Sequence, residues 1–197
     1  MNKQDFYVLG DIFAKSDELL LRKIDEADKD LYFDLYVSTS NLPMKALEFM
    51  RETVVDDALT GDDVYYSIIR INDNKYLGNL RVYKLNEDMP EVGLDICEEY
   101  RNCGVGYKAL KLFFETVREK MDIHRLLIRA YSNNVASLKL ISKFDAEELD
   151  GEKNEFQKIM DKAAEILGND FVDSLDLNED TGSEDEDAFI RRFVLEI

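Results

Sequence analysis

The sequence has no tryptophan, and it has only one histidine and two cysteines among its 197 residues. Two cysteines cannot build a disulfide framework, which small secreted domains use to stabilise a minimal core. One histidine and two cysteines also fall short of the four ligands typical of a structural zinc site. We therefore expect no metal and a fold that depends on an ordinary hydrophobic core.

Long apolar segments are missing as well. The longest run without a charged residue covers only 35–44, whereas a membrane helix needs about 20 consecutive apolar residues. The first residues, MNKQDFYVLGD, lack the basic region, apolar block and small-residue cleavage site of a secretory leader. These features predict a cytoplasmic protein without a membrane partner.

Basic residues are scarce, with 25 lysines and arginines against 43 acidic residues and a net charge of −18. Such a field disfavours binding to nucleic acids or anionic lipids and attracts cationic substrates. The charge is uneven, because residues 145–197 carry a net charge of −13 while residues 101–143 carry +6. This basic stretch favours a polyanionic ligand such as a phosphorylated cofactor, although a solvated lysine-rich helix face would have the same composition.

Apolar residues make up 45% of the chain, and 21 residues are phenylalanine or tyrosine, which predicts one folded domain. Apolar periodicity and turn residues predict strands and helices that alternate along most of the chain. The expected strands are 18–24, 64–71, 76–85, 91–97, 124–131, 147–152 and 188–197, with a further short one at 6–9. The expected helices are 28–37, 43–61, one around 110–121, 135–143 and 156–167, and 170–187 is expected to be an acidic surface loop. This order predicts a mixed α/β (α+β) domain in which an antiparallel meander meets a strand–loop–helix–strand unit.

The most informative motif lies between the strand at 91–97 and the helix that follows it. Its residues are Arg101-Asn102-Cys103-Gly104-Val105-Gly106-Tyr107. Glycines let such a loop turn its backbone N–H groups inward, where the helix dipole also favours a pyrophosphate. A Walker A loop is excluded because no Gly-Lys-Ser/Thr follows. A dinucleotide fingerprint matches by letters, but the ribose-binding acid is missing. An acyl-coenzyme A loop of the form Arg/Gln-x-x-Gly-x-Gly/Ala is the third interpretation.

With this loop the chain resembles the GNAT superfamily of N-acetyltransferases, close to its RimJ/RimL-like branch. The segments that carry the resemblance are LLLRKI, EVGLDICEEYRNCGVGYKAL and RAYSNNVASLKLISKFDAEELDGE, in the family's order and within residues 18–152. The resemblance implies a GNAT fold, with antiparallel N-terminal strands, two splayed parallel central strands and helices on both faces. It divides the chain into an N-terminal extension (1–17) and a GNAT domain (18–197) with an acidic helix–loop insertion at about 152–187.

The resemblance also implies acetyl-CoA as co-substrate and assigns cofactor-binding residues by position. The loop amides would hold the pyrophosphate, the backbone of Ile96 and Cys97 would bond the pantetheine arm, and Asn134 and Ser137 would lie near the cofactor. The complete set is Ile96, Cys97, Arg101, Asn102, Cys103, Gly104, Val105, Gly106, Tyr107, Asn134 and Ser137. The sequence departs from the family at Ile141, where many members have a tyrosine that acts as general acid.

Acetyl transfer to an amine needs a group that takes the ammonium proton and a group that protonates the departing thiolate. Family position favours Glu91 as the base, with Asp95 four residues along the same strand face as the alternative. Ser137 is the candidate acid, and Tyr131 is a weaker one. The expected activity is direct transfer to a primary amine, on a small molecule or a protein or peptide N-terminus, by a monomer or homodimer. A non-catalytic acyl-CoA-binding protein of the same fold is the alternative.

Overall fold

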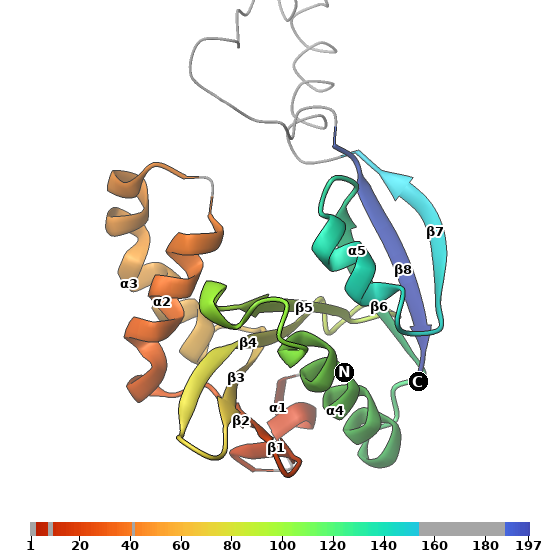
Figure 1. Cartoon of the computed structure of the whole chain (residues 1–197), viewed down its shortest axis with the longest axis horizontal. Helices are drawn as coiled ribbons and strands as arrows, with labels where there is room; N and C mark the ends of the chain where they lie inside the picture. Colours follow the sequence, from red (N-terminus) through yellow and green to blue (C-terminus); the bar gives the residue numbers. More distant parts are fainter. Residues whose placement is uncertain (1–2, 8–9, 41, 154–187) are drawn as a thin grey trace, which may run out of the picture. The chain divides into compact units, whose positions relative to one another are not determined.

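The computed structural model describes residues 3–7, 10–40, 42–153 and 188–197, which form two compact units (Figure 1). The first unit comprises residues 1–128 and 195–197, and the second comprises residues 129–194. Among the described helices, none is long and apolar enough to cross a membrane.

The first unit is built on a meander of antiparallel strands, as the sequence predicted. Its strands are β1 (Ile12–Lys15), β2 (Leu19–Lys23), β3 (Val64–Arg70), β4 (Lys75–Tyr83) and β5 (Glu91–Ile96), hydrogen-bonded in that order. The first half of β6 (Arg125–Tyr131) then pairs with β5 in parallel, with Glu91 opposite Leu127 and Val92 opposite Ile128. The parallel pair places β5 at the centre of a mixed sheet, which confirms the predicted α/β class.

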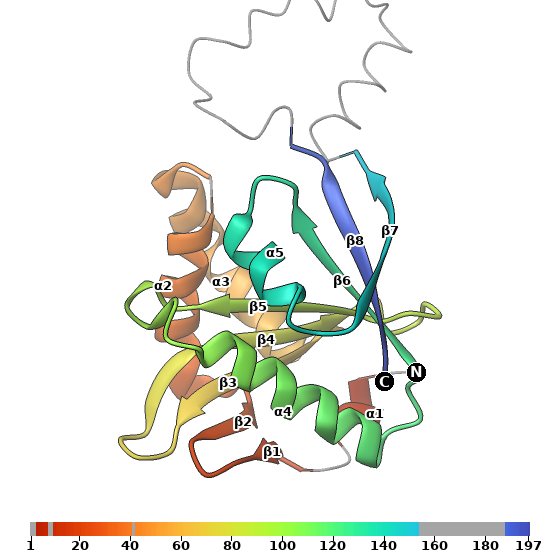
Figure 2. The same ribbon diagram turned by 45° about the vertical axis from the view of Figure 1, so that its right-hand side comes forward.

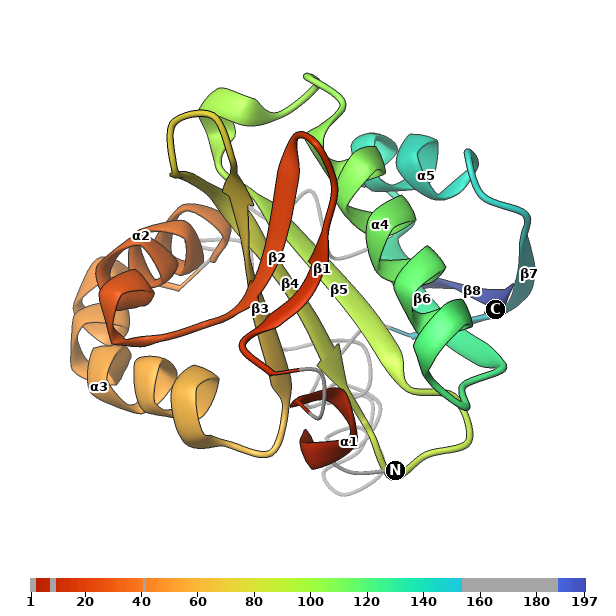
Figure 3. The same ribbon diagram turned by 90° about the horizontal axis from the view of Figure 1, so that it is seen from below.

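Helices cover both faces of these strands (Figure 3). Helices α2 (Lys29–Thr39) and α3 (Met44–Thr60) lie on one side, and α4 (Val105–Lys120) lies on the other. Pro43 precedes the first residue of α3 and Gly61 follows its last, as expected from the preference of proline for helix starts and of glycine for helix ends. Two short 3₁₀ segments, Glu26–Asp28 and Glu98–Tyr100, lead into α2 and into the loop before α4.

Alternation along β3 divides the hydrophobic core between the two faces. Tyr65 packs in a cluster with residues of α2 and α3, namely Tyr32, Phe33, Leu47, Val55 and Ala58, together with Ile24. Its neighbour Tyr66 packs on the other side, where its ring centroid lies 4.6 Å from that of Phe13. Phe13 in turn stacks at 5.3 Å on Phe113 of α4. Successive strand residues point to opposite faces, so one strand anchors both layers.

The N-terminal segment differs from the expectation. Residues 6 and 7 were predicted to start a short strand, but they belong to helix α1 (Lys3–Tyr7). Phe6 is fully buried, and its carbonyl accepts a hydrogen bond of 3.3 Å from the Tyr66 hydroxyl. These contacts with β3 outweigh the strand preference of aromatic residues, which is weak and depends on context. The neighbouring strand β1 pairs with β2, so part of segment 1–17 belongs to the sheet.

The second unit contains the rest of β6, helix α5 (Val135–Ile141), β7 (Ala146–Glu152) and most of β8 (Ile190–Glu196). The strand order here is β6–β8–β7, and β7 and β8 run side by side (Figure 2). Arg191 of β8 forms a bidentate ion pair with Glu148 of β7 at 2.6 and 2.7 Å. The strands expected at 147–152 and 188–197 are confirmed, while the helix and acidic loop expected between them lie outside the described residues.

Candidate active site

The glycine loop places the start of α4 against a tight turn. After the 3₁₀ segment Glu98–Tyr100, residues 101–104 form the turn, in which Asn102 and Gly104 adopt left-handed φ angles of 59° and 81°. Gly104 is the N-cap of α4 and offers no capping side chain, and the first turn of α4 contains no acidic residue. The first N–H groups of a helix have no acceptor within it, so these amides fit an anion.

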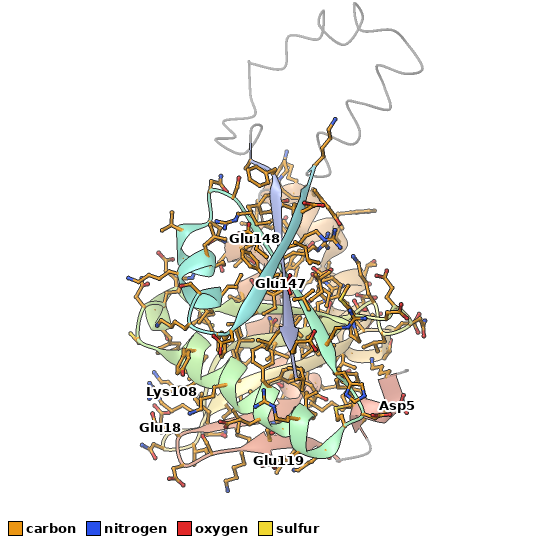
Figure 4. All side chains as sticks on the ribbon, turned by 90° about the vertical axis from the view of Figure 1, so that its right-hand side faces the viewer. Asp5, Glu18, Lys108, Glu119, Glu147 and Glu148 are labelled. Carbon is orange, nitrogen blue, oxygen red and sulfur yellow. The ribbon has the colours of Figure 1, made fainter. Side chains whose placement is uncertain are left out.

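Two basic side chains flank this turn. Arg101 is exposed at its start, and its Nε donates a 3.0 Å hydrogen bond to the carbonyl of Ile96. Lys108, one turn into α4, lies 2.5 Å from the carboxylate of Glu18 (Figure 4). Lys108 is therefore already partly neutralised, and Arg101 is the cation whose position best fits a phosphate at the loop.

The end of β5 approaches β4 closely. A Cβ atom on Gly78 of β4 would lie 2.1 Å from the carbonyl oxygen of Asp95, so only glycine permits this pairing. The Cys97 amide donates to the Leu77 carbonyl at 2.9 Å, and the Cys97 carbonyl accepts from the Tyr100 amide at 2.9 Å. The Ile96 carbonyl instead accepts from the exposed Arg101 side chain. Ile96 and Cys97 are the two residues assigned to the pantetheine arm. The Ile96 carbonyl can exchange its side-chain donor for a ligand more easily than the Cys97 groups can leave their backbone partners.

A cavity of about 370 Å³ lies in the first unit among α2, α3, β3, β4 and β5. Its lining includes three tyrosines, two aspartates and one arginine: Tyr32, Tyr36, Tyr65, Asp57, Asp95 and Arg81. Its volume falls within the usual range of small-molecule sites, about 300–1,000 Å³. The cavity therefore offers carboxylates and aromatic rings in a space suited to a small organic cation.

Asp95 is the carboxylate that β5 contributes to this cavity. It lies opposite Asn79 of β4, which also lines the cavity. The side chain is open to solvent, but protein atoms crowd around its carboxylate, and this desolvation raises the pKa of Asp95. The charges of Arg101 and Arg81 oppose the increase. An ionised carboxylate with a raised pKa accepts a proton more readily than an ordinary one.

Glu91 has a different environment, although it lies on the same face of β5. It is fully buried, it accepts a hydrogen bond from the Tyr83 hydroxyl, and its Oε2 lies 3.1 Å from Nζ of Lys84. Glu91 is not among the residues that line the cavity. The role of base that sequence position assigned to Glu91 therefore stays a prediction, and the geometry draws attention to Asp95.

Arg81 lines the cavity and also lies over Tyr83, the tyrosine whose hydroxyl donates to Glu91. Its guanidinium donates to Asp63, with a distance of 3.0 Å from Nε, and it lies over the rings of Tyr65 at 5.2 Å and Tyr83 at 4.6 Å. Neither Arg81 nor Asp57 is among the site residues predicted from the sequence. Neither residue belongs to a motif, and no local pattern indicates that α3, β4 and β5 meet around one space.

The remaining predicted residues belong to the second unit. The side chain of Asn134 accepts a 3.0 Å hydrogen bond from the Ser137 amide and so caps α5. Ile141 is buried, which explains its apolar side chain, and Tyr131 is exposed. The structure thus groups residues 91–107 in one unit and residues 131–141 in the other.

Comparisons with known proteins agree with this architecture. The model of the family described as "Acetyltransferase (GNAT) domain" matches residues 18–147. An acetyltransferase of the GNAT family from Bacillus anthracis matches with a TM-score of 0.63 at 16% identity, over 93% of this chain and 97% of that one. No curated protein sequence matches the chain.

Two further solved structures have names that mention an acceptor. A mutant of spermidine N-acetyltransferase SpeG from Vibrio cholerae matches with a TM-score of 0.63 at 11% identity, over 89% of this chain and 94% of that one. RimL, a ribosomal L7/L12 alpha-N-protein acetyltransferase, matches with a TM-score of 0.64 at 15% identity, over 94% of each chain. At these identities the matches show a shared fold.

Proposed function

Since the chain belongs to the GNAT family of acetyltransferases, we propose that it transfers the acetyl group of acetyl-CoA directly to a primary amine bound in the 370 Å³ cavity. The names of the solved structures mention both spermidine and a protein N-terminus. They share too little sequence with this chain to select between a small amine and a peptide. The observation that carries the proposal is an acid-lined cavity in the same unit as an uncapped glycine loop.

The glycine loop fits the pyrophosphate of a CoA thioester, which supplies an activated acetyl group. The first-turn amides of α4 would hold the phosphates, and Arg101 would contribute its charge when it leaves the Ile96 carbonyl. That carbonyl then becomes free to accept a hydrogen bond from an amide of the pantetheine arm. Lys108 would contribute less because it is paired with Glu18.

Asp95 is the proposed proton acceptor. An alkylamine is protonated at neutral pH, so a base must remove one ammonium proton before nitrogen can attack the carbonyl carbon. Asp95 borders the cavity, and its raised pKa favours accepting that proton. Formation of the C–N bond and breakage of the C–S bond then release the thiolate. Ser137 remains the predicted donor of the proton that the thiolate takes up.

The test measures thiol release from acetyl-CoA with a panel of primary amines, alongside melting temperatures with CoA, NAD and ATP. We expect amine-dependent thiol release and a shift in melting temperature that CoA produces and NAD and ATP do not. Asp95→Asn should lower turnover by about 10²–10⁴, the usual contribution of a positioned base, and leave the CoA shift intact. If Glu91→Gln shows this pattern instead, Glu91 is the base. Stabilisation by CoA without transfer to any amine would support a binding protein instead.

A further inference from the structure

We propose that Asp57 of α3 binds a second cationic nitrogen of the acceptor, so that the preferred acceptors are amines with two protonated nitrogens. This inference rests on the proposed function and assigns the acceptor class to the same cavity. Asp95 would face the nitrogen that reacts, and Asp57 would hold the one that does not.

The two carboxylates reach the cavity from different elements. Asp57 lies one turn beyond Thr53 on α3, and both residues line the cavity with Asp95 of β5. Burial is the main cause of the raised pKa of Tyr32 and of Tyr65, whose rings belong to the same lining, and the negative charge of Asp57 adds to both increases. Asp57 is therefore close to the aromatic part of the cavity, whereas the charges that act on Asp95 are Arg101 and Arg81.

The positive charges near Asp57 are already engaged. Arg81 lines the cavity, but its guanidinium is paired with Asp63 and stacked on two tyrosine rings. Lys3 donates to the Gly61 carbonyl at 2.5 Å and lies over the Tyr7 ring. The lining carries two aspartates, Asp57 and Asp95, and one arginine, and that arginine is paired with Asp63 outside the lining. The site thus keeps an excess of negative charge that two ammonium groups would balance.

The helix ends around the cavity strengthen this preference. Asp57 belongs to the last turn of α3, and neither α2 nor α3 has a basic residue in its last turn. The C-terminal end of a helix carries a partial negative charge, so an aspartate there destabilises the helix. Thr39, the last residue of α2, also lines the cavity. The cavity therefore meets the negative ends of two helices, which an organic cation would offset.

Aromatic rings complete a site for such a cation. Tyr32 and Tyr65 pack edge to face with centroids 5.6 Å apart, and Tyr36 is a third ring in the lining. Aromatic faces attract ammonium groups, and the attraction grows as the cation is desolvated. Carboxylates and rings together discriminate against an acceptor whose far end is neutral or anionic.

The experiment compares an unbranched monoamine with the diamine of the same chain length, at saturating acetyl-CoA, on the full chain. We expect kcat/KM of the wild type to be at least tenfold higher for the diamine, beyond the factor of two for its two reactive ends. Asp57→Asn should remove most of this preference by raising KM for the diamine, and should lower kcat/KM far more for the diamine than for the monoamine. Asp56→Asn is the matched control, since it removes the same charge from the neighbouring exposed residue of α3.

Melting temperatures confirm that each variant is folded before its kinetics are compared. Equal kcat/KM for diamine and monoamine in the wild type overturns the inference and leaves the proposed function standing. An equal loss of kcat/KM for the diamine in Asp57→Asn and in Asp56→Asn also overturns it, because the loss then reflects overall charge. Absence of thiol release with every amine contradicts the proposed function itself.

Discussion

At the scale of single residues, Asp95 and Glu91 show how two carboxylates on one strand face acquire different chemistry. Glu91 is fully buried, and its carboxylate has the Tyr83 hydroxyl and the Lys84 ammonium as partners. Asp95 opens to the cavity and is desolvated, with two arginines acting on it through their fields. The first arrangement suits a structural role, and the second suits a base.

Asp95→Asn should stabilise the fold at neutral pH while it lowers turnover. Because the native pKa of Asp95 is raised, the native state binds its proton more tightly than the unfolded chain does. Its contribution is therefore most favourable below the unfolded pKa, about 3.9, and is lost as pH rises through the native value. We expect Asp95→Asn to melt at a higher temperature than the wild type at pH 7, with a difference that shrinks toward pH 4.

Glu91→Gln provides the contrast in the same thermal melts. It leaves the Lys84 ammonium without its carboxylate and should destabilise the protein by roughly 1–3 kcal/mol at pH 7. A lower melting temperature for Asp95→Asn at pH 7 would show that its carboxylate stabilises the fold, against the direction of the pKa shift.

At the scale of elements, the turn between β5 and α4 combines backbone strain with an uncapped helix start. Asn102 and Gly104 both have a positive φ angle, and residues other than glycine adopt this left-handed backbone conformation at a cost in free energy. A Cβ atom on Gly104 would meet no heavy atom within 4 Å. Glycine at this position is thus favoured by its left-handed φ angle and by the space that a ligand of the α4 amides would need. Packing within the fold does not require it.

Gly104→Ala should therefore weaken CoA binding as well as the fold. The left-handed conformation costs about 1–2 kcal/mol for a residue with a Cβ atom, and that atom would stand where a pyrophosphate approaches. Gly10→Ala is a matched control, since Gly10 has φ of 82° and a Cβ atom there would also meet no heavy atom within 4 Å. Chemical unfolding should show similar destabilisation in both variants. CoA titration should show at least a tenfold loss of affinity in Gly104→Ala alone.

Equal CoA affinity in the two glycine variants would contradict the assignment of the loop. The α4 amides would then not contact the cofactor, and the basic residues around them would only be solvated side chains.

At the scale of the whole molecule, the net charge of −18 sets a field that favours cationic acceptors. Much of it comes from residues 145–197, which include the acidic segment 170–187. A field from separated charges is screened within about 8–10 Å at physiological ionic strength, whereas contacts inside the cavity are screened much less. Varying the salt concentration can therefore separate the contribution of the long-range field to acceptor binding from that of the contacts inside the cavity.

Replacing Glu179, Asp180 and Glu184–Asp187 with serine and asparagine should raise KM for a cationic acceptor at low salt and have little effect at high salt. Affinity for CoA should change by less than tenfold, about 1.4 kcal/mol, because these residues are not assigned to its site. Steady-state kinetics at low and at high salt measure the first effect and CoA titration the second. A larger loss of CoA affinity would place the segment in the cofactor site.

The sequence by itself determined most of the elements, the α/β class and the family. Periodicity located α2, α3, α4 and the β3–β4 hairpin, because amphipathic patterns and turn residues act over a few neighbouring positions. The Arg101–Tyr107 motif placed a glycine turn before α4 for the same reason, since φ preferences are local. Local preference failed at residues 6 and 7, where burial against Tyr66 produced a helix in place of a strand.

Only the tertiary structure decided which carboxylates share the cavity. Family position favoured Glu91 over Asp95, but it carried no information on which carboxylate borders the cavity, because solvent exposure and the field at a carboxylate come from distant residues such as Arg81. Nor could it bring Asp57 of α3 to the same space as Asp95 of β5. Helix and strand signals are properties of adjacent residues, whereas a site is made by elements that packing brings together. The chemistry of this cavity is therefore a property of the fold.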